Sequence, residues 1–263
     1  MAEPQKVTVI GVGLIGGSIS LAVKSRWPQV TVTGFDIDSA VQSEALSQGV
    51  IDEIASDIES SCAGADFVFI ATPVLIVPRV IEAIASVVGE ETIVTDVGST
   101  KTGIVEMAEK ALPPTTNFIG GHPLAGSEQA GLQAATPELL KDSVYVLTPT
   151  KRTSPDAFQK LHQLLTNLGA KVMALSPNKH DEIVAGVSHL PHLTATALVN
   201  VVAAVEEEGE NRLLFAAGGF RDLTRIASGN PELWADICLD NKEAIAVSID
   251  KLTTGLNNIR QVI

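Results

Sequence analysis

The sequence has few cysteines, few basic residues and no long apolar run. Its only two cysteines, Cys62 and Cys238, lie far apart, so we expect neither a disulfide framework nor a cysteine metal site, and a reducing cytoplasmic compartment is favoured. The chain has 18 lysines and arginines and 31 acidic residues, so its net charge is −13. Because the basic residues form no cluster, nucleic acids and anionic membranes are not expected as partners.

Two further absences narrow the class of protein. No apolar run approaches the roughly 20 residues that a membrane-spanning helix needs. We also expect no signal peptide, because the first four residues lead directly into a β-type segment. With 263 residues, 45% of them hydrophobic, the chain can form two domains or one large α/β domain with an ample core.

A glycine-rich turn near the amino terminus dominates the pattern. The apolar run 6–10 breaks into glycines and then into a helical pattern. In the spacing Gly-x-Gly-x-x-Gly the first glycine permits a tight turn, the second lets the backbone approach a pyrophosphate, and the third lets the helix pack on its strand. Free N–H groups at the helix N-terminus then bind the anion. The residues expected at a dinucleotide are Gly11, Val12, Gly13, Leu14, Ile15 and Gly16.

An acidic residue follows at the distance expected for a ribose contact. The second β-type run, 30–35, ends at Asp36. A carboxylate there would accept hydrogen bonds from the adenosine ribose and repel a 2′-phosphate, which favours NAD over NADP. The alternative is that Asp36 caps the helix that begins near Ser39.

Alternating β-type and helical patterns extend to about residue 175, as is typical of a Rossmann-type, mostly parallel sheet with crossover helices. Beyond Ser176-Pro177 the pattern is helical. We therefore predict an α/β domain over residues 1–176 and an all-helical domain over residues 177–263. Further strands are expected at 66–71, 92–97, 118–120, 144–147 and 171–175, and helices at 14–26, 40–48, 76–88, 102–110 and 155–168. Breaks in the helical part are expected near 189–192, 208–210 and 228–231.

The helical domain contains a segment that needs a partner. Residues 193–205 are apolar on more than one face, and a domain of fewer than ninety residues can hardly bury them alone. A homodimer formed through the C-terminal helices is the expected solution.

In a parallel sheet the ligand binds at the loops that follow the strands. After the run 66–71 we expect Thr72 and Pro73 to lie at the cofactor. In the loop 98–101, Ser99 or Thr100 is expected to cap the following helix. The loop 120–126 carries His122, whose neutral imidazole could accept a hydroxyl proton while hydride leaves the same carbon. The alternative is that His122 is a surface or structural histidine.

The helical part carries further polar candidates. His192 follows Pro191 and is a candidate substrate contact, whereas His180, at the entry to this part, is expected to have a structural role. Arg221 and Arg225 are four residues apart, so they share a helical face, and a guanidinium suits a carboxylate. The alternatives are an ion pair of Asp222 with Arg225, or a surface arginine.

Five blocks together resemble the prephenate/arogenate dehydrogenase family of tyrosine biosynthesis, in the family's order and over nearly the whole chain. The blocks are Gly11-x-Gly-Leu-Ile-Gly-Gly-Ser18, Asp96-Val-Gly-Ser-Thr-Lys101, Gly120-Gly-His-Pro-Leu-Ala-Gly126, Ser188-His-Leu-Pro-His192 and Gly218-Gly-Phe-Arg-Asp-Leu-Thr-Arg-Ile-Ala227.

The resemblance implies NAD-dependent oxidative decarboxylation of a small cyclohexadienol substrate, without a metal. It implies that His122 hydrogen-bonds the ring hydroxyl and that Ser99 orients both His122 and the nicotinamide. It also implies that Arg225 holds a substrate carboxylate, and that His192 and Trp234 belong to the substrate pocket. The choice between prephenate and arogenate stays open, with His192 favouring prephenate.

Two other functions remain to be weighed. The chain could be a different dehydrogenase with a Rossmann half and a helical dimer half, of the 3-hydroxyacid or pyrroline-carboxylate reductase type. It could also be a non-catalytic dimer that senses NAD. Turnover of prephenate or arogenate with NAD⁺ would support the family's activity, and neither of the other two functions predicts it.

Overall fold

A parallel sheet occupies the amino-terminal part of the chain. The structure is a computed structural model that describes residues 3–126, 129–204 and 212–263. The chain divides into two compact units, Met1–His180 and Asp181–Ile263. In the described part of the first unit, six strands form a sheet in the order β3-β2-β1-β4-β5-β6, and each neighbouring pair is parallel. The strands are β1 (Lys6–Ile10), β2 (Thr31–Phe35), β3 (Glu53–Ile54), β4 (Phe67–Ile70), β5 (Ile93–Asp96) and β6 (Asn117–Phe118).

The strand order reverses at β1, and this reversal locates the ligand edge of the sheet. The chain runs outward from β1 to β2 and β3, then returns to β4 on the other side of β1. In sheets wound this way, ligands bind beyond the carboxyl ends of the strands at the point of reversal. The loops after β1, β2, β4 and β5 therefore lie at the edge where a cofactor is expected.

A second, three-stranded sheet corrects one sequence-based expectation. Its order is β7-β8-β9, formed by β7 (Gly120–Pro123), β8 (Val144–Thr148) and β9 (Lys171–Ala174). Strand β7 runs antiparallel to β8, and β8 runs parallel to β9. The prediction of one strand at 118–120 followed by a loop was wrong, because the chain passes from β6 in one sheet to β7 in the other. His122 lies inside β7, opposite Val146.

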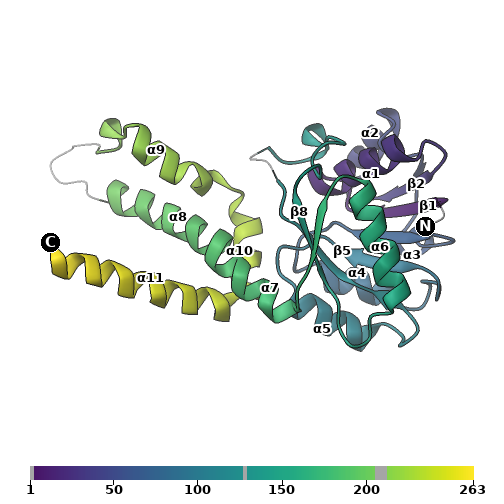
Figure 1. Ribbon diagram of the computed structural model, residues 1–263. Helices are drawn as coiled ribbons and strands as arrows, with labels where there is room; N and C mark the ends of the chain where they lie inside the picture. Colours follow the sequence, from purple (N-terminus) through teal and green to yellow (C-terminus); the bar gives the residue numbers. More distant parts are fainter. Residues whose placement is uncertain (1–2, 127–128, 205–211) are drawn as a thin grey trace. The chain divides into compact units, whose positions relative to one another are not determined.

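Helices cover both faces of the six-stranded sheet (Figure 1). Successive strand side chains point to opposite faces, and alternate residues of β1, β4 and β5 accordingly enter two separate apolar cores. One core includes residues of α1 and α6, and the other includes residues of α4 and α5. The helices are α1 (Leu14–Arg26), α2 (Ser39–Ser47), α3 (Ile58–Ser61), α4 (Val77–Ile84), α5 (Thr102–Ala111) and α6 (Pro155–Asn167).

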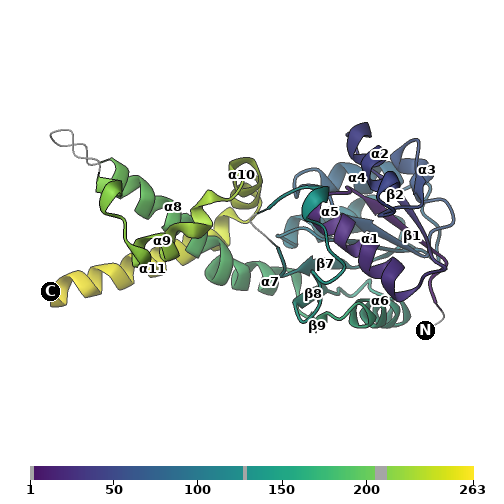
Figure 2. The same ribbon diagram turned by 90° about the horizontal axis from the view of Figure 1, so that it is seen from above.

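The second unit consists of helices and turns (Figure 2). Helix α7 (Pro177–Val184) continues through a π-helical turn, Ala185–His189, into α8 (Leu190–Ala203). After residues outside the described ranges, which include the expected break at 208–210, come the 3₁₀ turn Arg212–Phe215, α9 (Gly218–Thr224), the 3₁₀ turn Arg225–Ser228, α10 (Pro231–Asp240) and α11 (Lys242–Val262). The domain boundary after residue 176 stays a prediction.

The helical unit leaves much apolar surface uncovered within one chain. In α8 only His192 and Ala195 are buried. Val201 is 65% exposed, and Val262 is 85% exposed at the end of α11. None of the described helices is long and apolar enough to cross a membrane. Apolar helix faces of this kind need a partner surface.

Candidate active site

The glycine turn between β1 and α1 is built by close backbone approach. Gly11 has φ +95°, and a Cβ atom there would lie 2.6 Å from the carbonyl oxygen of Ala71. At Gly16 a Cβ would lie 2.0 Å from the Gly11 oxygen, so only glycine fits. Gly13, by contrast, has open space around it and precedes the first residue of α1 without a side-chain cap. The turn thus presents uncovered backbone at a helix N-terminus, the arrangement that binds a phosphate.

Asp36 is tied to this turn and does not cap a helix. Its Oδ2 accepts a hydrogen bond from the Val12 N–H at 2.8 Å, and its Oδ1 accepts one from the Asp38 N–H at 3.0 Å. The N-cap of α2 is Asp38, whose carboxylate accepts from the Ala40 N–H. The alternative that Asp36 caps this helix is therefore wrong.

The loop after β4 contributes an unused hydroxyl. Oγ1 of Thr72 is buried and has no hydrogen-bond partner within the described part of the chain. Buried hydroxyls are almost always bonded in folded proteins. The neighbouring loop backbone at Ala71 touches the glycine turn, so Thr72 is positioned where a bound dinucleotide could supply the partner. Pro73 follows it and accepts the Ile76 N–H through its carbonyl.

Gly17 and Ser18, which directly follow the glycine motif, have a role that the spacing of the motif did not indicate. A Cβ at Gly17 would lie 2.9 Å from the Ala135 Cβ and 3.0 Å from Leu132 Cδ1. The Ser18 hydroxyl accepts a hydrogen bond from the Thr136 N–H at 3.0 Å. Gly17 and Ser18 therefore hold the segment 132–136 against α1. Only the block Gly-Gly-Ser in the sequence hints at this.

His122 makes a direct contact with a second histidine. Its Nδ1 lies 2.8 Å from Nε2 of His180, and the ring centroids are 5.0 Å apart at 69°. His122 is half-buried on β7, whereas His180 is fully buried near the start of α7. The sequence indicated only a structural role for His180, since no local pattern relates position 180 to position 122.

The loop after β5 differs from the expected helix cap. Ser99 is half-buried in a bend, and α5 begins at Thr102 with Lys101 as its N-cap residue and no side-chain capping bond. The prediction that Ser99 or Thr100 caps α5 was therefore wrong. The Lys101 side chain turns inward and pairs with Asp96, and both side chains are fully buried.

In the helical unit, His192 stacks on Trp234. The ring centroids are 3.6 Å apart and the planes differ by 7°. Burial lowers the pKa of His192, and a hydrogen bond to the Ile226 backbone opposes this shift only in part. Nδ1 of His192 is buried and has no hydrogen-bond partner among the described residues. Burial thus favours the neutral ring, with one nitrogen left for a ligand.

Arg225 begins the 3₁₀ turn that follows α9, and Arg221 lies on α9 itself. The four-residue spacing of these arginines thus crosses from α-helical to 3₁₀ geometry. Arg225 is exposed in the single chain. His189, which precedes α8, is buried, and its Nδ1 accepts a hydrogen bond from Asn241 Nδ2 at 3.2 Å, a structural contact.

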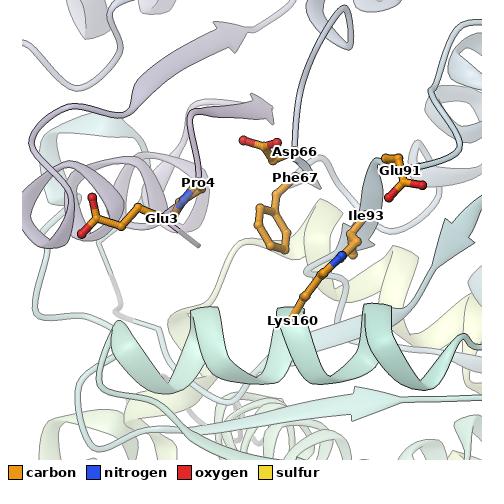
Figure 3. A pocket seen from close by; sticks show the side chains of 7 residues that line it. All are labelled: Glu3, Pro4, Asp66, Phe67, Glu91, Ile93 and Lys160. Atoms are coloured by element: carbon orange, nitrogen blue, oxygen red, sulfur yellow. The ribbon is translucent and has the colours of Figure 1, made fainter. Parts of the chain in front are cut away.

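A separate cavity lies at the opposite edge of the sheet (Figure 3). Its volume is about 230 Å³, and it opens at the amino ends of β1, β4 and β5. Ligands of doubly wound sheets bind at the carboxyl ends, so this cavity is not the expected site. The lining residues are Glu3, Pro4, Asp66, Phe67, Glu91, Ile93 and Lys160.

Comparisons with known proteins decide the family. Residues 19–174 match the model of the prephenate dehydrogenase nucleotide-binding domain, and residues 176–263 match that of the prephenate dehydrogenase dimerization domain. The chain belongs to the prephenate dehydrogenase family. It is 40% identical to a Bacillus subtilis prephenate dehydrogenase over 97% of this chain and 69% of that protein. It is 33% identical to a Zymomonas mobilis cyclohexadienyl dehydrogenase over 98% and 88% of the two chains.

Solved structures agree with this prephenate dehydrogenase assignment. The Aquifex aeolicus prephenate dehydrogenase, in complex with hydroxyphenyl propionate and NAD⁺, matches with a TM-score of 0.92 and 32% identity, covering 98% of this chain and 90% of that one. The Synechocystis arogenate dehydrogenase matches with a TM-score of 0.85 and 32% identity, covering 98% and 91%. The protein is an NAD-dependent oxidoreductase, a prephenate/arogenate dehydrogenase.

The competing dehydrogenase class shares only the fold. A Coxiella burnetii pyrroline-5-carboxylate reductase matches with a TM-score of 0.56 at 14% identity, covering 97% of each chain. The second unit carries the family's dimerization domain, which agrees with the uncovered apolar surface of its helices.

Proposed function

We propose that this prephenate dehydrogenase acts on prephenate in preference to arogenate, with His122 as the base that takes the ring hydroxyl proton. The observation that carries the role of His122 is its contact with His180. The preference for prephenate rests on His192, as the resemblance of its block to the family implies. Two neutral imidazoles that share a hydrogen bond must divide the roles of donor and acceptor. If Nδ1–H of His122 donates to His180, then Nε2 of His122 carries the lone pair that a base needs.

His180 then supports the charge that proton transfer creates. When Nε2 of His122 accepts the substrate proton, the ring becomes an imidazolium, and its Nδ1–H still donates to Nε2 of His180. A hydrogen bond from a charged donor is about twice as strong as a neutral one. The same contact orients the His122 ring and favours its protonated form during the reaction.

The cofactor residues of the proposal are those of the glycine turn and its neighbours. The backbone from Gly11 to Gly16, with Val12, Leu14 and Ile15 between the glycines, would hold the pyrophosphate of NAD, and Asp36 would bind the ribose. Thr72 and Pro73 would line the cofactor, and the unpartnered Thr72 hydroxyl supports this. When bound, NAD⁺ accepts the hydride from the ring carbon. Ser99 would help to orient His122 and the nicotinamide.

The helical unit supplies the substrate-binding residues of the proposal. Arg225 would bind a substrate carboxylate, because a guanidinium offers two parallel donors to two oxygens. His192 would contact the substrate through Nδ1, and its stacking on Trp234 supports a fixed ring orientation. Oxidation makes the hydroxyl carbon a ketone, and loss of CO₂ then restores aromaticity, so the protein has mainly to position the substrate, accept one proton and hold an anion.

We also propose that the protein is a homodimer formed through its C-terminal helices. The uncovered apolar faces of α8 and α11 support this, since exposed apolar area of that extent usually marks an interface. The cytoplasmic location belongs to the same proposal, and it is supported by the two free thiols, Cys62 and Cys238.

A steady-state experiment that crosses two substrates with two cofactors tests the activity. Purified protein is mixed with prephenate or arogenate and with NAD⁺ or NADP⁺, and the absorbance of the reduced cofactor is followed. We expect the highest kcat/KM with prephenate and NAD⁺. A higher value with arogenate would overturn the substrate preference. Binding of NADH without turnover of either substrate would support an NAD sensor instead.

A further inference from the structure

A buried ion pair lies behind the strand that carries His122. Asp96 is the last residue of β5, Lys101 is the N-cap residue of α5, and both side chains have 0% exposure. Lys101 Nζ donates to Asp96 Oδ2. Burying two charges is costly, and a well-packed apolar pair is often equally stable. The pair therefore needs an explanation other than packing.

The ion pair holds both polar groups of Gly121, the residue before His122. The Gly121 N–H donates to Asp96 Oδ1 at 3.2 Å, and the Gly121 carbonyl accepts from Lys101 Nζ at 2.7 Å. Asp96 Oδ2 also accepts from the Gly98 N–H at 2.8 Å. One carboxylate thus anchors the loop that contains Ser99 and the strand that contains His122.

The close fit of β7 against β5 leaves little freedom at this point. A Cβ atom at Gly121 would lie 2.7 Å from the Asp96 carbonyl oxygen and 2.8 Å from Thr95 Oγ1. A Cβ at Gly120 would lie 2.5 Å from Thr148 Oγ1 and 3.4 Å from Lys101 Cδ. Strand β7 therefore rests directly on the ion pair and the strand end, and a shift of the pair must shift the strand.

We propose that Asp96 and Lys101 are positioning residues for His122. By holding the N–H and the carbonyl of Gly121, the pair fixes the backbone from which the His122 ring reaches His180. Charge-assisted hydrogen bonds are short and directional, and an apolar pair cannot supply them. The inference rests on the proposed role of His122 as the base.

The test uses a variant that removes both charges together. Lys101→Met alone leaves the buried Asp96 carboxylate without its counterion, so it is expected to fold poorly. In the double variant Asp96→Asn/Lys101→Met no lone charge remains. The asparagine offers one oxygen to two backbone N–H groups, and the Gly121 carbonyl loses the lysine donor.

A control removes a partly exposed lysine–aspartate pair elsewhere in the same unit. Lys24 Nζ lies 2.5 Å from Asp52 Oδ1, and Asp52 Oδ2 also accepts a hydrogen bond from the Val32 N–H at 2.8 Å. Lys24→Met/Asp52→Asn therefore removes a lysine, a carboxylate charge and part of a backbone anchor without touching Gly121.

We expect the Asp96→Asn/Lys101→Met variant to lose about 10- to 100-fold in kcat, the effect of a misplacement of about 1 Å at a reacting group. Its affinity for NADH should change little, because the glycine turn and Asp36 are untouched, and the control should keep the wild-type kcat. A second measurement needs no substrate. In protein labelled with ¹⁵N-histidine, the ring signal of His122, identified by its loss in His122→Asn, should shift in the double variant and not in the control.

Three results would overturn the proposal: a wild-type kcat in the double variant, an unmoved His122 signal, or an equal loss of kcat in the control. If the wild-type protein oxidised neither prephenate nor arogenate, the proposed function would fail, and the histidine signal would still decide whether the pair positions His122.

Discussion

Nδ1 of His122 lies 2.8 Å from Nε2 of His180, a residue 58 positions further along the chain. Only one of two neutral imidazoles can donate in this bond, so Nε2 of His122 is able to accept a proton when its Nδ1–H is the donor to His180. The pairing joins β7 to the start of α7, where His180 is the last residue of the first unit, and it gives the proposed base a fixed orientation.

We expect His122→Asn to lower kcat by about 10²–10⁴-fold, the usual effect of losing an acid–base group. The affinity for NAD⁺ should change little, because the glycine turn and Asp36 are untouched. Steady-state kinetics and NADH titration measure the two effects. His162→Asn, at a half-buried histidine on α6, is the control and should keep the wild-type turnover. Unchanged turnover in His122→Asn would remove this residue from the mechanism.

Asp36→Ser should relax the discrimination against NADP. The substitution removes the charge that repels a 2′-phosphate, so we expect the ratio of kcat/KM for NAD⁺ to that for NADP⁺ to fall by about tenfold or more, or about 1.4 kcal/mol. Asp38→Ser, which retains a capping side chain for α2, is the matched control and should leave the ratio unaltered. An unchanged ratio in Asp36→Ser would contradict a ribose contact.

Arg225→Ala should chiefly raise the KM of the substrate. A hydrogen bond to a charged group contributes about 1.5–3 kcal/mol, so we expect a rise of roughly 10- to 100-fold with a smaller change in kcat. Arg221→Ala, on the preceding helix, serves as the comparison. If Arg225→Ala altered only thermal stability, the arginine would be structural.

The stability of the protein should depend on pH through His192. Burial lowers the pKa of this imidazole below its ordinary value of 6.5. At a pH below 6.5 this histidine is protonated more fully in the unfolded chain than in the folded one. The free energy of unfolding should therefore fall as the pH decreases from about 7 to about 5. Urea denaturation of wild type and His192→Gln across this range measures the effect, because the variant lacks the titrating group. A wild-type-minus-variant difference that is independent of pH would contradict it.

Tyr145→Phe should stabilise the protein or leave its stability unchanged. The phenol is fully buried, burial raises its pKa, and its hydroxyl has no hydrogen-bond partner in the described part of the chain. Removing an unpartnered buried hydroxyl should raise the free energy of unfolding by about 1 kcal/mol. In the control Thr8→Val, the lost hydroxyl donates to the Ser61 carbonyl at 2.6 Å, so stability should fall. A destabilised Tyr145→Phe would indicate that this hydroxyl has a partner.

Local patterns predicted much of the first unit. The helix expected at 14–26 is α1 (Leu14–Arg26), because the glycine turn and the helical pattern after it lie within one short stretch. Besides β7, which was expected as a loop, the sequence did not indicate β3 and α3, which have two and four residues. Segments of that length span only about one period of the hydrophobic pattern, so no repeat can be recognised in them.

The sequence indicated some of the candidate site residues and missed others, again because sequence patterns report only on neighbouring positions. Glycine spacing and the acid after β2 indicated candidate cofactor residues, since a turn of this kind requires particular residues at neighbouring positions. Lys101 was expected in a helix-capping loop, where lysines are usually exposed. Nothing near it in the sequence shows that its side chain pairs with Asp96 and holds Gly121.

The sequence by itself determined the class of fold, the glycine turn, the change to helices after residue 176 and, through five blocks in order, the family. Only the tertiary structure decided that β7 leaves the main sheet, that His122 pairs with His180 and that Asp96 and Lys101 hold the strand between them. Periodicity and turn chemistry act over a few neighbouring residues and can be read along the chain. Hydrogen bonds between distant segments form only when the cores have packed and brought those segments together.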